Sequence, residues 1–156
     1  MKLPKQLGKE NLEEDVQAAL EKESIELCSD SNISIPLLQL NPELRKQIFY
    51  AKFQGELIVG SRDVEKCLKN ELHGLKKVNN LSDRVSRVLI VTNDGSPRFY
   101  RQLEFLHKEQ GGRVLICRLD IDSSLMGTIL ELKEKQVKAV LLNRKESVVN
   151  VLKSLL

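Results

Sequence analysis

Short apolar runs that alternate with amphipathic segments are the feature that most restricts how this chain folds. Arg87–Thr92 (RVLIVT) is a continuous apolar run of strand length, typical of a strand buried on both faces. Similar runs lie at Glu56–Val59, Arg113–Leu119 and Val137–Leu142. Segments of helical periodicity separate and follow these runs, at Arg62–Glu71, Pro97–Glu109, Ser123–Lys135 and Lys145–Leu155. This alternation predicts an α/β fold: a three-layer α/β/α sandwich with a mixed sheet of about four strands.

The first forty residues differ in pattern from the rest. Residues 10–24 have one apolar helical face, and a polar break follows at residues 28–34. Asn41-Pro42 is a typical helix start, with Asn as the N-cap and Pro in the first turn. We therefore expect an acidic, partly helical N-terminal extension over residues 1–40 and an α/β domain over residues 41–156.

Charge is distributed unevenly along the chain. The net charge is +3, but residues 1–9 carry +3 and residues 10–30 carry −7, so residues 31–156 carry +7. A basic domain favours a polyanionic partner through counterion release, although a solvated charged surface is the alternative. Aromatic residues make up only 4% of the chain, and there is no Trp. This composition argues against a protein that stacks single-stranded bases on aromatic side chains.

Nothing in the sequence indicates secretion or a membrane. No apolar run follows the first eight residues, and no stretch reaches the roughly 18 apolar residues that span a bilayer. The three cysteines, Cys28, Cys67 and Cys117, are odd in number and far apart. They therefore favour a reducing, intracellular environment over a disulfide framework.

Motifs that carry catalysis or bind metals are missing from the sequence. His73 and His107 have no cysteine or carboxylate at metal-ligand spacing, and no GxSxG, GxxxxGK[ST] or GxGxxG pattern occurs. Asp120 and Asp122 flank Ile121 at a predicted strand end, but no third acid lies nearby, so a solvated loop is the better interpretation. We expect no enzyme activity, no metal and no small-molecule cofactor.

Three segments stand out by their order along the chain. The first runs from Gly55 to Lys69 (GELIVGSRDVEKCLK). The second is the strand Val88–Thr92 followed by Asn93-Asp94-Gly95-Ser96-Pro97. The third runs from Arg118 to Gly127 (RLDIDSSLMG).

Together these segments resemble the kink-turn RNA-binding family of ribosomal and nucleolar proteins, the L-seven-Ae type, over about residues 42–156. Gly60 and Lys66 match the family's G-x-N-E-x-x-K pattern at the start of a helix. Asp94 and Pro97 match its A-x-D-x-x-P pattern after the central strand. Residues 121–127 are similar to its later loop, with Met126 where Leu is usual and a spacing about one residue shorter.

The resemblance implies that the chain binds a structured RNA. The implied RNA-binding residues are Gly60, Ser61, Arg62, Asp63, Lys66, Asp94, Leu119, Asp120, Ile121, Asp122 and Ser123. Arg62 and Asp63 replace the Asn and Glu with which the family recognises sheared G·A pairs. Because arginine has no acceptor, Arg62 cannot reproduce the asparagine contacts, and a diverged RNA or placement by neighbouring proteins is expected.

Elementary chemistry supports the same residues. A helix N-terminus offers free N–H groups to phosphate, and Arg62 and Lys66 lie four residues apart on one face. Asp63 is able to accept hydrogen bonds from base amino groups, and an apolar loop around Leu119 and Ile121 is expected to cover an extruded nucleotide. The simpler alternative is that these segments are only turns and helix starts with solvated charges.

Within this family, the chain is most similar to the member found in nuclear ribonuclease P and ribonuclease MRP. The similarity lies in the divergence at the RNA-reading positions, the modest net charge and the acidic extension. This similarity implies a non-catalytic subunit that acts with other protein subunits in 5′ processing of precursor tRNA and in rRNA processing, in the nucleus and its nucleolus. Residues 1–40 and 72–86 are then expected to contact other subunits. A small nucleolar or ribosomal RNA-binding protein and a protein–protein adaptor with the same fold remain as alternatives.

Overall fold

The central sheet has six strands, two more than the sequence predicts. In the computed structural model, which describes residues 1–156, the strand order is β1-β2-β5-β4-β6-β3. The strands are β1 (Ser24–Glu26), β2 (Ser34–Leu38), β3 (Leu57–Val59), β4 (Arg87–Val91), β5 (Val114–Leu119) and β6 (Ala139–Leu142). β4 pairs in parallel with β5, and β5 in parallel with β2, whereas β6 is antiparallel to both β4 and β3. The sheet is therefore mixed, as predicted, and β2, β3, β4 and β5 all run in one direction.

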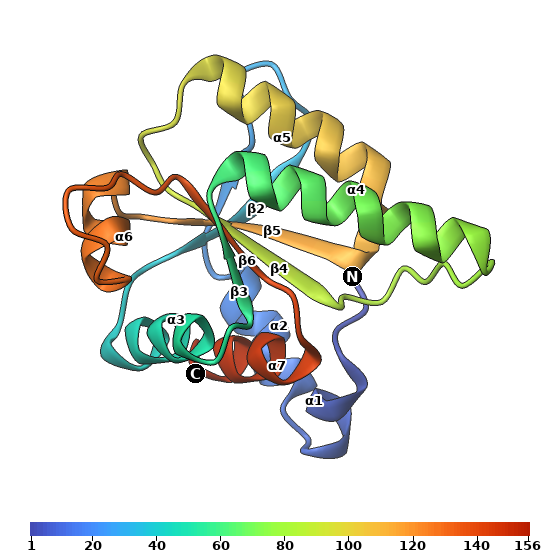
Figure 1. Ribbon diagram of the computed structural model, residues 1–156. Coiled ribbons are helices and arrows are strands. Elements are labelled where there is room, and N and C mark those ends of the chain that lie inside the picture. The colour runs from blue at the N-terminus through green and yellow to red at the C-terminus, as the bar shows by residue number, and fades with distance from the viewer.

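Helices cover both faces of this sheet (Figure 1). They are α1 (Lys5–Lys9), α2 (Glu13–Glu21), α3 (Pro42–Phe53), α4 (Ser61–Lys77), α5 (Pro97–Gln110), α6 (Ser123–Ile129) and α7 (Lys145–Lys153). α4 and α5 lie side by side on one face, and α3 and α7 lie on the other. None of the helices combines the length and the apolar character needed to cross a membrane.

The sheet separates two hydrophobic cores. Along β4, Val88 and Ile90 point into the core beneath α3 and α7, while Leu89 and Val91 point into the core beneath α4 and α5. This alternation is the two-residue period of a strand. It explains why the whole run is apolar, because both faces of the strand are covered.

Residues 1–40 pack onto the same sheet as the rest of the chain. β2 pairs with the end of β5 at Leu38↔Leu119, and Leu3, Leu7 and Leu20 are buried in the core that also contains Leu119. The predicted boundary at residue 40 therefore does not coincide with a break in packing. The sequence does not reveal β1 and β2, because they flank the polar break and because Pro36 interrupts the pattern of β2. Their pairing partners lie in the tertiary structure and leave no local signal.

Two predicted helices have different ends. α4 continues to Lys77, so the connection between α4 and β4 is shorter than the predicted 72–86. α6 ends at Ile129, before the predicted end at Lys135, because the chain turns back there with positive φ at Glu131 and Glu134. This turn places residues 131–135 against α6, as the hydrogen bond from Leu132 N to Gly127 O (2.9 Å) shows.

Candidate RNA-binding surface

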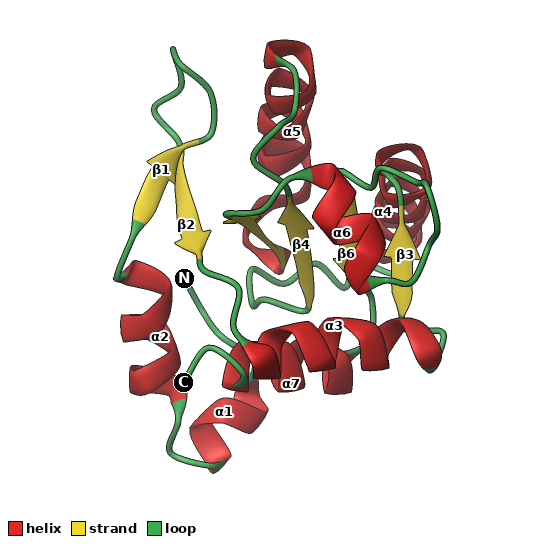
Figure 2. Ribbon diagram, turned by 90° about the vertical axis from the view of Figure 1, so that its left-hand side faces the viewer, coloured by secondary structure: helices red, strands yellow, loops and turns green.

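The three predicted segments lie at one end of the sheet, where β3, β4 and β5 finish and β6 begins. We call this the carboxyl end, and Figure 2 faces it, with α6 in front of β6. Gly60 N donates to Ala139 O (2.9 Å), and Thr92 N donates to Lys138 O (3.0 Å), so the start of β6 joins the first two segments. Asn93 N donates to Ile121 O (2.9 Å) and joins the second segment to the third. The fold therefore brings the three segments together.

The start of α4 is open to solvent. Gly60 has φ +97°, a left-handed conformation that favours glycine, and no atom lies within 4 Å of where a Cβ would stand. No side chain caps the helix. Ser61, Arg62, Asp63 and Lys66 are exposed, and neither Arg62 nor Lys66 has a carboxylate within 4 Å. Free N–H groups and two unpaired cations therefore lie within the first two turns of α4.

The start of α5 adds two further cations that the sequence motifs do not include. Ser96 caps α5 by accepting from Phe99 N (3.1 Å), and Pro97 occupies the first turn. Arg98 and Arg101 follow, exposed and without a carboxylate within 4 Å. α4 and α5 begin at the same end of the same sheet face, so their first two turns carry four unpaired cations. The signal available in the sequence is the repeat of paired basic residues just after a predicted helix start.

Asp94 ties the loop after β4 to the start of α6. Its carboxylate accepts from Thr92 Oγ1 (2.8 Å), from Ser123 N (3.1 Å) and from Ser123 Oγ (2.6 Å). Burial raises the pKa of Asp94, but the hydrogen bonds from Ser123 and Thr92 outweigh it and hold this pKa below its ordinary value. Asp94 therefore holds the loop in place as an ionised carboxylate.

Tyr100 and Arg118 hold the same loop from below. Tyr100 Oη donates to Thr92 O (2.8 Å) and accepts from Gly95 N (2.9 Å). The Arg118 guanidinium lies 4.9 Å from the centre of the Tyr100 ring and donates to Asn93 O (2.9 Å). A Cβ on Gly95 would overlap the side chains of α5. These contacts together fix the conformation of the loop after β4.

The loop after β5 does not present the apolar side chains that are expected to cover an extruded nucleotide. Leu119 is fully buried and Ile121 is 6% exposed, and both belong to the hydrophobic core. This burial corrects the prediction that they face an extruded nucleotide. The reason is that Leu119 ends β5 opposite Leu38 of β2, a strand that the sequence does not reveal.

The polar residues of this loop mainly shape it. Asp120 accepts from Asn93 Nδ2 (3.1 Å), and Asp122 caps α6 by accepting from Leu125 N (2.8 Å). Ser123 is buried against Asp94. Of the predicted residues, those at the start of α4 offer exposed, unpaired groups to a ligand, and those after β4 and β5 position the surface.

The histidine and cysteine side chains are dispersed over the structure. No group of three or more His, Cys, Asp or Glu side chains lies close enough together to hold a metal ion. His73 is exposed, and burial lowers the pKa of His107. Burial raises the pKa of Cys117 to about 12, so this thiol stays protonated at neutral pH.

Comparisons with models of protein families and with characterised proteins find no match to this chain.

Replacing Asp94 with asparagine tests its structural role. Because Asp94 is exposed and solvent screens its charge, we expect the free energy of unfolding at pH 7 to fall by less than about 1 kcal/mol as the charge-assisted hydrogen bonds from Ser123 and Thr92 are weakened. The pKa of Asp94 is depressed in the folded protein, so its stabilisation is present above the unfolded pKa of about 3.9 and disappears as the pH falls through the folded pKa. The free energies of unfolding of the two proteins, measured by urea denaturation, should therefore converge as the pH falls through this range. The exposed Asp30→Asn is the control, and an equal loss of stability there would contradict the assignment.

Proposed function

We propose that this chain is a non-catalytic RNA-binding protein that contacts a structured RNA through the carboxyl end of its sheet. The observation that carries the proposal is the start of α4, where an uncapped helix N-terminus lies beside unpaired Arg62 and Lys66. The proposed RNA-contacting set is Gly60, Ser61, Arg62, Asp63 and Lys66, extended by Arg98 and Arg101.

The chemistry of this set suits a phosphate backbone. Free N–H groups at a helix N-terminus bind anions, and Gly60 leaves room for a phosphate to approach the backbone closely. Arg62 offers a planar fork to a phosphate or a guanine edge, and Lys66 adds a point charge one turn later. Asp63, between them, supplies the acceptor that a base amino group needs.

The resemblance to the kink-turn family extends this proposal to a specific assembly. We propose that the chain is a protein subunit of nuclear ribonuclease P and ribonuclease MRP, located in the nucleus and its nucleolus. In such an assembly it would bind and stabilise the RNA that processes precursor tRNA and rRNA. Sequencing the RNA that co-purifies with the protein from cells tests this assignment. Recovery of ribosomal or small nucleolar RNA instead would favour the alternative within the same family.

The double substitution Arg62→Ala and Lys66→Ala is expected to weaken binding to the co-purifying RNA about 10-fold or more, because each phosphate or base contact contributes roughly 1 kcal/mol or more. A titration of binding against salt concentration measures both the affinity and the number of phosphate contacts. Both side chains are exposed, so folding should be unaffected. The matched control is Lys22→Ala with Lys46→Ala, which removes two exposed cations elsewhere. Equal affinities of the double variant and the wild type would refute the proposal.

A protein–protein adaptor is the second candidate, and one observation favours it. A groove of about 220 Å³ lies between α4 and α5, with Val64, Leu103 and Phe105 among its lining residues. Phe105 is 74% exposed and lies at this groove, so a partner seated there would cover its ring. Purification from cells that recovers proteins and no RNA would support this function.

A further inference from the structure

A large cavity lies at the opposite end of the sheet from the candidate surface. Its volume is about 820 Å³, and it opens where β4 and β5 begin and where α7 starts. The N-terminal segment forms one wall and is fastened there by Val85 N donating to Lys2 O (2.8 Å) and by Arg84 Nη1 donating to Leu3 O (2.6 Å). The cavity therefore combines segments from both ends and the middle of the chain.

The lining of this cavity is strongly basic. Six cations line it: Lys5, Lys9, Arg84, Arg87, Arg113 and Lys145. Glu71 is the only acidic lining residue, which leaves a formal excess of five positive charges. Lys5, Lys9, Arg84 and Lys145 have no carboxylate within 4 Å. We call this site the basic cavity.

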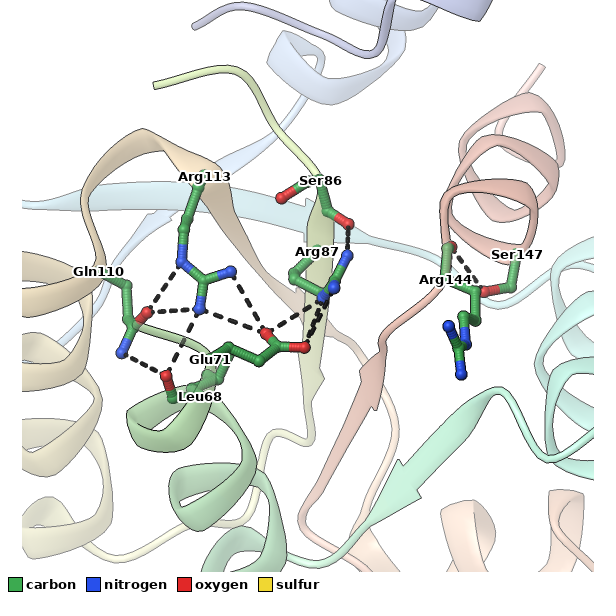
Figure 3. A network of polar contacts seen from close by, with 8 residues as sticks. All are labelled: Leu68, Glu71, Ser86, Arg87, Gln110, Arg113, Arg144 and Ser147. Atoms are coloured by element: carbon green, nitrogen blue, oxygen red, sulfur yellow. Dashed lines mark hydrogen bonds and ion pairs between the residues drawn. The ribbon is translucent and has the colours of Figure 1, made fainter. Parts of the chain in front are cut away.

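The floor of the basic cavity is held rigidly. Arg87 and Arg113 converge on the single carboxylate of Glu71, at 3.0 Å and 3.3 Å (Figure 3). Arg113, whose side chain is only 4% exposed, also donates to Gln110 Oε1 at 2.7 Å and 3.0 Å. One carboxylate neutralises one of the two guanidinium groups, so a fixed positive charge remains at the floor. The flexible lysines stand at the exposed rim.

We propose that the basic cavity binds phosphate groups of the RNA backbone, as a second RNA contact distinct from the carboxyl end of the sheet. The inference rests on the proposed function and deepens it. The N–H groups of Arg87 and Arg113 are held by Glu71, Gln110 and backbone carbonyls, so this pair supplies a net positive potential. The exposed lysines at the rim are the groups that are free to contact a multiply charged phosphate ligand. No aromatic side chain lines the cavity, so it offers no stacking platform for bases and holds the backbone only.

The two contacts are separated by the length of the sheet. A five-residue strand such as β4 spans about 17 Å. One RNA that contacts both sites must therefore extend over at least this distance.

The triple substitution Lys5→Gln, Lys9→Gln and Lys145→Gln tests the basic cavity in the full-length protein. The probe is a labelled stem–loop RNA long enough to span both ends of the sheet, titrated between about 50 and 200 mM salt. We expect the slope of log affinity against log salt to become shallower by about 2–3, because each phosphate that the protein neutralises contributes about 0.9 to this slope. The matched control, Lys22→Gln with Lys46→Gln and Lys108→Gln, makes the same change in net charge at exposed sites outside both surfaces.

The outcomes separate the two RNA contacts. A shallower slope of log affinity against log salt for the triple variant than for the control supports phosphate binding in the basic cavity. This holds for any RNA affinity of the Arg62 and Lys66 double variant. Equal slopes for the triple variant and the control overturn it, and weaker binding in the double variant alone then leaves only the carboxyl end. Binding of polyglutamate in place of the RNA, with the same weakening in the triple variant, also overturns it and indicates an acidic protein ligand.

Discussion

Replacing Glu71 with glutamine is expected to lower the free energy of unfolding by about 3 kcal/mol, because removal of one partner from a buried ion pair leaves the other charge uncompensated. The side chain of Arg113 is 4% exposed, and Glu71 supplies the one carboxylate within 4 Å of it. Gln110 and Leu68 O accept hydrogen bonds from Arg113 but carry no negative charge. Urea denaturation at neutral pH measures the change in stability.

Glu65→Gln is the matched control on the same helix. Glu65 pairs with Lys69 at 3.0 Å, but both side chains are more than half exposed, so this substitution is expected to cost less than about 1 kcal/mol. Similar changes in stability in the two variants would show that the contacts of Arg113 do not depend on charge.

The Glu71→Gln variant also bears on the basic cavity. The substitution removes the one acidic residue that lines the cavity, so the cavity becomes more positive. The variant should therefore lose stability while its RNA affinity stays equal or rises. A protein in which affinity falls together with stability would indicate that the rigid floor matters more than the charge.

Replacing Gly127 with alanine is the second substitution with a large expected effect. A Cβ at this position would overlap the carbonyl oxygen of Lys135, which belongs to the turned-back segment after α6. The overlapping atom is backbone, and the segment is fastened to Gly127 O by Leu132 N, so relief requires the whole turn to move. We expect the free energy of unfolding to fall by about 2–3 kcal/mol, as for overpacked interiors.

Gly74→Ala provides a control with the opposite sign. Gly74 lies in α4, and no atom is found within 4 Å of the position that its Cβ would occupy. Alanine there should stabilise the protein by about 0.5–1 kcal/mol, because glycine is a poor helix former. Thermal unfolding of both variants checks the pair. A stabilising effect at both positions would mean that the segment after α6 does not pack as described.

Local patterns predict the strands and helices from Asn41 onward. Asn41-Pro42 and Ser96-Pro97 mark the starts of α3 and α5, and in each the predicted cap side chain accepts the expected backbone hydrogen bond. The continuous apolar run of β4 is recognisable because burial on both faces leaves a pattern within one short segment. These features depend on residues within a few positions of one another, which a single sequence displays.

Features that depend on distant partners are not predictable in this way. β2 forms a strand because β5 lies beside it. Leu119, at the end of β5, is buried in the core, whereas the expected RNA-binding loop places it on a ligand-facing surface. The basic cavity is invisible in the sequence, since Lys5, Arg84, Arg113 and Lys145 lie far apart along the chain.

The sequence by itself therefore determined the alternating strands and helices, the helix starts and the basic character of residues 31–156. Each of these follows from local periodicity, capping chemistry or composition. Tertiary structure alone decided that residues 1–40 complete the sheet and its core, and that two separate sets of cations gather at opposite ends of it. The reason is that burial and the proximity of charges depend on which segments meet in space. Spacing along the chain does not specify these contacts.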